Sequence, residues 1–245
     1  MQTDRTCYDL FDTWTEQSAY ILGLWWADGY IHLHKDKHHK QGYYKEFSVA
    51  NTDHQIMLLL GSILKRAVVP MHKSKPNWQQ CYQIIVRSEK LFDFCYNLVG
   101  TTHKSNTPLI MPNIPPEFLC HFIRGYFDGD GSIHWTHYNN RHGNLTKELR
   151  SSFTAGNDTG TFLEQLSRLL NTLIGTKHKN ITSGNNRKLI FGQYDSMKLC
   201  NWMYGNATIY MVRKKLIWDS ADKTRLTNSI KYHSKIVQSN SQGGI

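Results

Sequence analysis

The chain contains one short pattern twice, as 20-YILGLWWADG-29 and as 122-FIRGYFDGDG-131. Each copy is an apolar run with small residues four positions apart, and each ends in Asp-Gly. Residues four apart share one face of a helix, and faces without large side chains let two helices approach closely. The pattern therefore predicts two similar halves that pack against each other through these helices. The small residues are Gly23 and Ala27 in the first copy, and Gly125 and Gly129 in the second.

The sequence around the first copy predicts the order αββαββα. Alternating apolar and polar residues indicate strands, and apolar residues spaced three and four apart indicate helices. Asp53 is the expected N-cap of the second helix, whose buried face should carry Ile56, Leu59, Leu60, Ile63 and Leu64. The elements are expected at about 18–28, 30–34, 43–51, 53–66, 68–73, 80–87 and 88–100.

The sequence around the second copy repeats that order, which makes the predicted fold class α+β with two pseudo-symmetric αββαββα halves. Its elements are expected at about 116–129, 131–138, 148–156, a helix capped by Asp158 that runs to 174, 177–182, 187–193 and 196–205. We expect residues 1–100 and 116–220 to form the two halves, with 101–115 as a proline-containing linker. Residues 221–245 have the polar composition typical of a partly disordered tail.

The charge balance predicts a polyanionic partner. Among its 245 residues the chain has 29 Lys and Arg against 19 Asp and Glu, a net charge of +10 at pH 7. A basic domain of this kind usually meets nucleic acid, and a basic globular protein without such a ligand is the alternative. No apolar run is long enough for a membrane-spanning helix. No basic amphipathic helix with a clean apolar face is evident either, so no membrane partner is expected.

The cysteines and the N-terminal sequence predict an intracellular protein. The five cysteines show no CxxC spacing, which indicates neither a disulfide framework nor a zinc cluster. The first residues lack the apolar segment of a signal peptide. Reduced thiols therefore fit a bacterial or phage cytoplasm or an organelle matrix, and the sequence leaves the choice among these open.

The acids that end the two copies are candidate metal ligands. A carboxylate at a helix C-terminus faces the negative end of the helix dipole, which costs about 0.3 to 1 kcal/mol. A divalent cation would reverse that cost, and carboxylate and carbonyl oxygens are the ligands that Mg²⁺ prefers. Gly29 and Gly131 are suited to the left-handed residue past a helix end. A single Asp-Gly is often only a turn, but Asp28 and Asp130 occupy equivalent positions of a repeat.

The two patterns carry a family resemblance. ILGLWWADG and IRGYFDGDG resemble the two signatures of the LAGLIDADG homing endonucleases, in the single-chain, two-repeat form. PNIPPEFLCHFIRGYFDGDGSI at 112–133 and MVRKKLIW at 211–218 resemble flanking segments of intron- and intein-associated members, so the resemblance covers about residues 18–218. The first copy departs from the pattern at Trp26, where the second copy has Asp128. The family's metal ligand is the later acid, so this departure leaves the expected activity intact.

The resemblance implies a monomeric, Mg²⁺-dependent, site-specific endonuclease that cuts both strands of a long DNA target to start insertion of a mobile intron or intein. The halves would pack through their LAGLIDADG helices and place saddle-shaped antiparallel sheets over DNA. Asp28 and Asp130 would bind the metal, together with the neighbouring Ala27 and Gly129. Mn²⁺ is expected to replace Mg²⁺, and Ca²⁺ to support binding only. The family's basic catalytic residues map to Lys104 and Lys214, with Arg213 as a rival of Lys214.

The predicted strands and their turns supply candidate DNA contacts. Basic residues concentrate at the turns and suit phosphates, while alternate strand residues suit base edges, with the DNA-facing parity left open. His32 and His34 also suggest zinc, but no third ligand lies near them in the sequence, so DNA or solvent is expected there. The candidates are His32, His34, Lys35, Lys37, Lys40, Lys73, Lys75, Gln83, Arg87, Arg141, Arg150, Lys177, Lys179, Arg187, Lys188 and Arg213.

Two other functions compete with cleavage. A relative that only binds, such as a maturase of its host intron RNA or a DNA-binding regulator, would share the scaffold, but loss of one acid would be expected and both are present. A metal-dependent hydrolase of a small phosphorylated substrate is disfavoured by the charge of +10 and by the lack of a Gly-rich phosphate loop. Maturase activity is compatible with cleavage.

Overall fold

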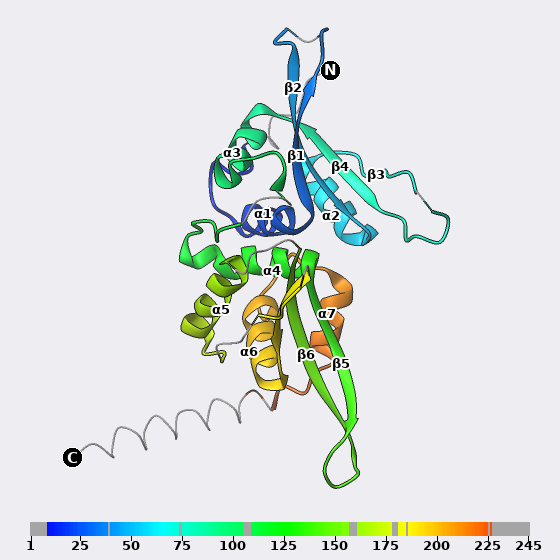
Figure 1. The fold of residues 1–245 in the computed structure, drawn as a ribbon, viewed down its shortest axis with the longest axis vertical. Coiled ribbons are helices and arrows are strands. Elements are labelled where there is room, and N and C mark those ends of the chain that lie inside the picture. The colour runs from blue at the N-terminus through cyan, green and yellow to red at the C-terminus, as the bar shows by residue number, and fades with distance from the viewer. Residues whose placement is uncertain are drawn as a thin grey trace, which may run out of the picture.

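The computed structural model describes residues 9–38, 40–73, 75–104, 109–156, 161–177, 181–184, 186–224 and 226. The helices that contain the repeated pattern, α1 (Glu16–Asp28) and α4 (Leu119–Asp130), pack against each other across the middle of the molecule. Figure 1 shows two long hairpins that run from this centre to opposite ends of the molecule. The structure confirms the predicted α+β class, with one antiparallel sheet in each half.

The first half has the predicted element order. After α1 come β1 (Gly29–Lys35), β2 (Tyr43–Asn51), α2 (His54–Leu64), β3 (Val69–Pro70), β4 (Tyr82–Arg87) and α3 (Glu89–Val99). The sheet order is β1-β2-β4-β3. The strand expected at 68–73 is much shorter, because Pro70 has no N–H to donate. The Met71 N–H still donates to the Cys81 carbonyl at 2.9 Å, but the Met71 carbonyl accepts from the Gln80 side chain at 2.7 Å. In α2 the prediction for Leu59 is wrong, since this side chain is 38% exposed.

The second half differs from the prediction in its sheet. After the 3₁₀ turn η3 (Pro116–Phe118) and α4 come β5 (Gly131–Asn139), β6 (Leu145–Gly156), α5 (Thr161–Ile174), β7 (Asn186–Phe191), α6 (Gln193–Tyr204) and α7 (Val212–Asp219). The sheet order is β5-β6-β7. The expected cap Asp158 lies outside the described residues, as does the tail from 227 onward.

The strand expected at 177–182 is absent from the described residues of that segment, which are 177, 181 and 182. Thr182 lies beside β7 and its N–H donates to the Lys188 carbonyl at 3.1 Å. The N–H of Lys188 donates to the Thr182 hydroxyl at 2.9 Å. A side-chain oxygen thus takes the place that a main-chain carbonyl would have in a strand ladder, and the prediction of a fourth strand there is wrong for these residues.

Each sheet has a core face and an outer face. In the first sheet Ile31, Phe47 and Val86 form one row of the ladder and are buried under the helices. The second sheet buries Leu149, Phe153, Leu189 and Phe191 in the same way. Because side chains alternate along a strand, the intervening residues of both sheets point to the opposite, outer face. Among the described residues no helix has the length and apolar character needed to cross a membrane.

The contact between α1 and α4 is a backbone contact. A Cβ atom at Gly23 would lie 1.9 Å from the carbonyl oxygen of Phe122, and one at Gly125 would lie 2.0 Å from that of Tyr20. A Cβ at Gly129 would lie 2.4 Å from the Cβ of Ala27. The glycines therefore set how closely the two helices approach, and the helix ends are brought together as a result.

Candidate functional site

The two acids of the repeated pattern are the last residues of α1 and α4, and the glycines after them begin β1 and β5. Gly29 and Gly131 have φ of −93° and −89°, so the predicted left-handed conformation is wrong at both. They are small for a different reason. A Cβ at Gly29 would lie 2.0 Å from the Cδ1 of Trp25, and one at Gly131 would lie 2.4 Å from the Phe127 carbonyl oxygen. The helix-to-strand turn has no room for a side chain.

Asp28 and Asp130 lie close enough to interact. Burial, together with repulsion from Asp28, raises the pKa of Asp130 to about 6. Burial also raises the pKa of Asp28, against the hydrogen bond from Asn51 and the charges of Lys104 and Lys214. Asn51 Nδ2 donates to Asp28 Oδ2 at 2.6 Å. Two neighbouring carboxylates that ionise reluctantly form an environment that a cation would stabilise.

Lys104 binds the end of α1, and Lys214 binds the end of α4. The Lys104 Nζ donates to the carbonyls of Trp25 and Trp26, both at 2.6 Å. The Lys214 Nζ donates to the carbonyls of Asp128 at 2.9 Å and Gly131 at 2.6 Å, and also to that of Phe127. The last carbonyls of a helix have no partner inside the helix and carry the negative end of its dipole. Each lysine therefore places a positive charge at the negative end of a helix dipole. From the sequence, a metal ion was the expected source of positive charge at these helix ends.

Both lysines are weakened as bases by their surroundings. Burial lowers the pKa of Lys104 to about 8, against the opposing charges of Asp130 and Asp28. Burial lowers the pKa of Lys214 to about 8, with Asp128 the main opposing charge. Two acids and two lysines from both halves thus form one cluster. Asn51 was missed by sequence reasoning, and its position as the last residue of a predicted strand, two before the N-cap Asp53, gave no indication that it contacts Asp28.

The metal site that the sequence predicts contains this pair of acids and no further acidic, His or Cys ligand in the described part of the chain. No group of three or more His, Cys, Asp or Glu side chains occurs there that could hold an ion. The His32 and His34 rings stack at 4.7 Å, and His34 Nε2 lies 3.4 Å from Glu46 Oε2. Two carboxylates and adjacent main-chain carbonyls are hard oxygen ligands, which fit Mg²⁺ when water completes the shell.

A pocket of about 800 Å³ opens beside the acids and is lined by both halves. Asp28, Asp130 and Lys104 lie on its wall together with residues of both sheets. The first sheet contributes His32 and His34 from β1 and Glu46 from β2, while Thr154, Ala155, Gly156 and Asn186 come from β6 and β7. The cluster of acids therefore faces the space between the two sheets and is accessible to a ligand that contacts both.

The candidate base-reading residues share the outer faces. His32 pairs with Glu46, and Glu46 with Arg87, so all three point away from the core face of the first sheet. Gln83 has the same orientation, and its Nε2 donates to the hydroxyl of Tyr30. In the second sheet Arg150 and Ser152 are on the outer face beside His134 and Ser132, which sequence reasoning did not name. The strand pairing therefore shows which polar residues point away from the core.

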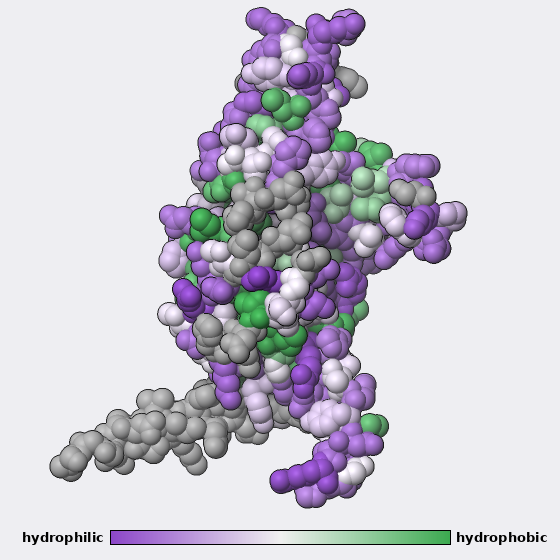
Figure 2. All heavy atoms as spheres, viewed as in Figure 1, coloured by the Kyte–Doolittle hydropathy of each residue, from purple (hydrophilic) through white to green (hydrophobic). Residues whose placement is uncertain are grey.

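The candidate phosphate contacts lie at strand ends and turns, where Figure 2 shows hydrophilic side chains over the tips of both long hairpins. Arg87 stacks on the Tyr44 ring at 4.3 Å, and Lys75 lies 5.5 Å from the Trp78 ring centre. Arg213 lies on the exposed side of α7 and bonds Asp53 of the first half at 3.1 Å. Lys179 is outside the described residues. The exposed candidates are Lys35, Lys37, Lys40, Lys73, Lys75, Arg87, Arg141, Lys177 and Lys188.

Comparisons with known proteins identify the fold. Residues 117–231 match the family model described as a LAGLIDADG-like domain. The structure is similar to that of the I-SmaMI LAGLIDADG homing endonuclease bound to cleaved DNA, with 13% identity, a TM-score of 0.55 and coverage of 84% of this chain and 87% of that chain. The structure is also similar to that of I-LtrWI, a LAGLIDADG homing endonuclease bound to target DNA. The identity is 14% and the TM-score 0.52, and the match covers 90% of this chain and 95% of that chain.

A further structure shows I-SmaMI bound to uncleaved target DNA in the presence of calcium ions, at 14% identity and a TM-score of 0.50, covering 95% of this chain and all of that one. Comparison with curated protein sequences gave no match. At these sequence identities the structural likeness establishes the fold alone. The family model adds a sequence match for the second half of the chain. Residues 117–231 match a LAGLIDADG-like domain, and the chain has the two-domain fold of the single-chain LAGLIDADG homing endonucleases.

Proposed function

We propose that this chain is a site-specific endonuclease that hydrolyses both strands of duplex DNA with Mg²⁺, and that its cut starts insertion of a mobile intron or intein. The observation that carries the proposal is the meeting of Asp28 and Asp130, one from each half, at the ends of the packed helices. Both acids line the same pocket, and repulsion from Asp28 contributes to the raised pKa of Asp130. A duplex has two antiparallel strands, and a site built from two related halves suits it.

The residues of the cluster have distinct roles in this proposal. Asp28 and Asp130 hold Mg²⁺, with the main-chain carbonyls of Ala27 and Gly129 beside them. The bound ion would polarise a phosphate oxygen and make its water a better nucleophile at neutral pH. Lys104 and Lys214 fix the helix ends and place positive charge beside the carboxylates, where the charge that develops on a phosphate is stabilised.

Duplex DNA is the proposed partner of the two outer faces. Lys and Arg side chains at the strand ends would contact phosphates on either side of the cluster, and outer-face polar residues would contact base edges. Residues 1–100 and 116–220 are the proposed halves and 101–115 the linker, so a single chain presents both surfaces and acts as a monomer. The similar structures are endonucleases bound to DNA, which supports this choice of partner.

Exchanging Mg²⁺ for Ca²⁺ is expected to preserve specific DNA binding and to stop cleavage. Ca²⁺ accepts looser and larger coordination by oxygen ligands, so it can occupy the acids without the compact octahedral arrangement of Mg²⁺. The measurement selects cleaved sites from a randomised duplex library with Mg²⁺, then follows binding and cutting of the selected site with each ion. Turnover that persists in excess chelator would contradict the metal role. Tight binding without cutting under all ions would support the binding-only alternative, a maturase or regulator.

Metal affinity is expected to fall as pH falls through about 6. In the metal-free protein the Asp130 carboxyl, with its pKa raised to about 6, holds a proton below that pH. A divalent ion must displace that proton, so affinity should drop up to about tenfold for each further pH unit. Calorimetric titration with Mn²⁺ from about pH 5 to about pH 8 measures the slope. Asp130→Asn, which has no proton to displace there, should show a shallower slope. Equal slopes for both proteins would refute the assignment.

A further inference from the structure

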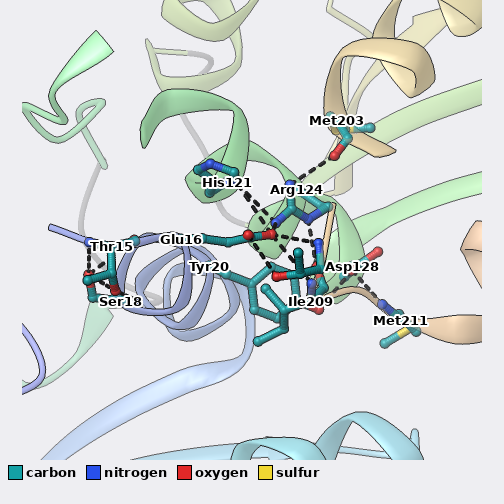
Figure 3. Close-up of polar contacts among 11 residues, drawn as sticks. Thr15, Glu16, Ser18, Tyr20, His121, Arg124, Asp128, Met203, Ile209 and Met211 are labelled. Carbon is teal, nitrogen blue, oxygen red and sulfur yellow. Dashed lines mark hydrogen bonds and ion pairs between the residues drawn. The ribbon is translucent and has the colours of Figure 1, made fainter. Parts of the chain in front are cut away.

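Asp128 is buried, yet it is not one of the acids at the helix ends. It is fully enclosed, and both of its carboxylate oxygens accept hydrogen bonds. Oδ2 accepts from the Tyr20 hydroxyl and from the Met211 N–H, each at 2.8 Å, and Oδ1 accepts from the Tyr204 hydroxyl at 2.5 Å. These donors come from α1, from the end of α6 and from the residue before α7. Figure 3 shows Asp128 between α1 and the chain that leads to Met211.

Met211 is the N-cap of α7, and Lys214 follows in the first turn of that helix. Lys214 is buried, with 2% of its surface exposed, and its ammonium holds the carbonyls at the end of α4. Met211 has no side-chain cap to offer the helix. The Asp128 carboxylate therefore fixes the start of α7 from outside, and the position of Lys214 beside the cluster depends on where α7 starts.

A second contact ties the same connection to the first half. The Arg124 guanidinium donates to the carbonyls of Ile209 at 2.8 Å and Met203 at 2.9 Å, and to Glu16 Oε1 at 2.6 Å. Glu16 also accepts from the N–H of Thr208 at 2.9 Å. Figure 3 shows these groups as one network from the start of α1 to the chain before α7. Arg124 holds the middle of the α6–α7 connection, and Asp128 holds its end.

The first half has no equivalent of this carboxylate. Trp26 occupies the position of Asp128 in the repeated pattern, and its buried indole N–H has no hydrogen-bond partner among the described residues. Lys104 is four residues past Gly100, the C-cap of α3, on a connection that the structure describes as far as residue 104. The two lysines bind equivalent helix ends. Only Lys214 lies on a helix whose N-cap residue is hydrogen-bonded to a buried carboxylate, that of Asp128.

We infer that Asp128 is a positioning residue: through the Met211 N–H it sets the start of α7 and thereby holds Lys214 at the second-half end of the cluster. The inference rests on the proposed function for its catalytic consequence, though its structural part does not. Loss of the Asp128 carboxylate should release Lys214 and leave Lys104 in place. A role in general stability alone would affect both lysines to the same extent.

Amine reactivity tests the structural part without any cleavage assay. Metal-free protein is acetylated with a limiting reagent, and the rates at Lys214 and Lys104 are read by peptide mass spectrometry. Because the Asp128 charge also opposes the lowered pKa of Lys214, the comparison that decides is with Asp128→Asn, which removes the same charge. In Asp128→Ala, Lys214 should react at least about tenfold faster than in Asp128→Asn, the factor expected when one charge-assisted hydrogen bond is lost. In Asp128→Asn the rise should be smaller, because the amide oxygen can still accept from Met211. Trp26→Phe is the matched control from the first half and should leave the Lys214 rate at the parent value.

Equal acceleration at both lysines in a folded Asp128→Ala protein, or none at Lys214, would overturn the inference. If Asp128→Ala does not fold, Met211→Pro replaces it, because it removes the N–H that donates to the carboxylate and Met211 has a φ of −78° that proline adopts. Its control is Met211→Ala, which also loses the buried Met211 side chain but keeps that N–H. Selective exposure of Lys214 in Met211→Pro supports the inference, and unchanged or equal rates overturn it.

Cleavage rates test the catalytic consequence. Single-turnover rates are measured for Asp128→Ala, Lys214→Met and the double variant, and for the same cycle with Lys104→Met. If Asp128 acts through Lys214, the Asp128→Ala/Lys214→Met double variant should cut no more slowly than Lys214→Met alone. In the cycle with Lys104→Met, the rate losses of the two single variants should multiply. Multiplying effects in both cycles would overturn the catalytic consequence. A parent protein that cuts no DNA would refute the proposed function, and the labelling result would still decide the role of Asp128.

Discussion

Asp28→Asn and Asp130→Asn are each expected to abolish double-strand cleavage and to leave specific DNA binding intact. Asn keeps the volume and hydrogen-bonding reach of Asp, and in Asp28→Asn the new amide oxygen could still accept the bond that Asn51 donates to Asp28 Oδ2. Each substitution removes one of the two negative charges that would hold the ion. Losing a group that stabilises the transition state commonly costs about two to three orders of magnitude in rate, and losing a metal ligand should cost at least that.

The same substitutions are expected to leave the metal-free protein at least as stable as the parent. The pKa values of Asp28 and Asp130 are both raised, which means that folding disfavours their charged forms at neutral pH. Each substitution removes the free-energy cost of burying a carboxylate charge. That cost is present at pH values above the raised pKa of the folded protein and disappears at pH values below the pKa of the unfolded chain. Thermal melting in chelator at neutral pH measures this. A variant that melts well below the parent would indicate that the carboxylates stabilise the fold through the two lysines.

A supercoiled plasmid that carries the selected target distinguishes two arrangements of the site. If each half cuts one strand with its own ion, each single variant should still nick the plasmid. If the halves share an ion, nicking and linearisation should fail together. Asp93→Asn is a matched control, because Asp93 is exposed on α3 and bonds Lys45 away from the cluster. Linearisation at the parent rate by either site variant would rule out the assignment of Asp28 and Asp130.

The repeated pattern predicted the centre of the molecule because helical spacing alone places Gly23 and Gly125 on matching faces. The sequence could not show which groups complete the helix ends. Lys104 and Lys214 lie 76 and 84 residues after the acids of their own halves in the numbering, and their bonds to the helix carbonyls depend on tertiary packing. Local patterns do not encode such contacts.

Other differences have similarly specific causes. The glycines after the acids were expected to be left-handed, but close packing by Trp25 and Phe127 explains them instead. The strand expected near 177–182 does not extend to Thr182, where the side-chain hydroxyl and not a main-chain carbonyl accepts the hydrogen bond from the Lys188 N–H of β7. The sequence did not decide which face of the sheet the polar strand residues occupy, because alternate positions of β1 on both faces carry polar or exposed side chains. The structure decides it, because Ile31 pairs with the buried Phe47 and the residues between these positions point to the other face.

Gly23→Ala and Gly125→Ala are expected to be the most destabilising small substitutions in the chain. In an ordinary helix interior, alanine is favoured over glycine by about 1 kcal/mol. Here the added Cβ would lie 1.9 Å or 2.0 Å from a carbonyl oxygen of the facing helix. A backbone carbonyl cannot rotate away as a side chain can, so the helices must separate, at a cost of about 3 kcal/mol or more. Urea unfolding of the metal-free protein measures the change.

Gly192→Ala is the matched control, because a Cβ there meets no atom within 4 Å and its φ is −80°. Its stability should stay within about 0.5 to 1 kcal/mol of the parent. Melting of Gly125→Ala near the parent temperature would show that the helices are not in backbone contact. A variant that folds with its helices apart should lose cleavage more than DNA binding, since the outer faces survive in each half while Asp28 and Asp130 no longer share one site. The glycines would then determine both the stability of the interface and the spacing of the proposed metal ligands.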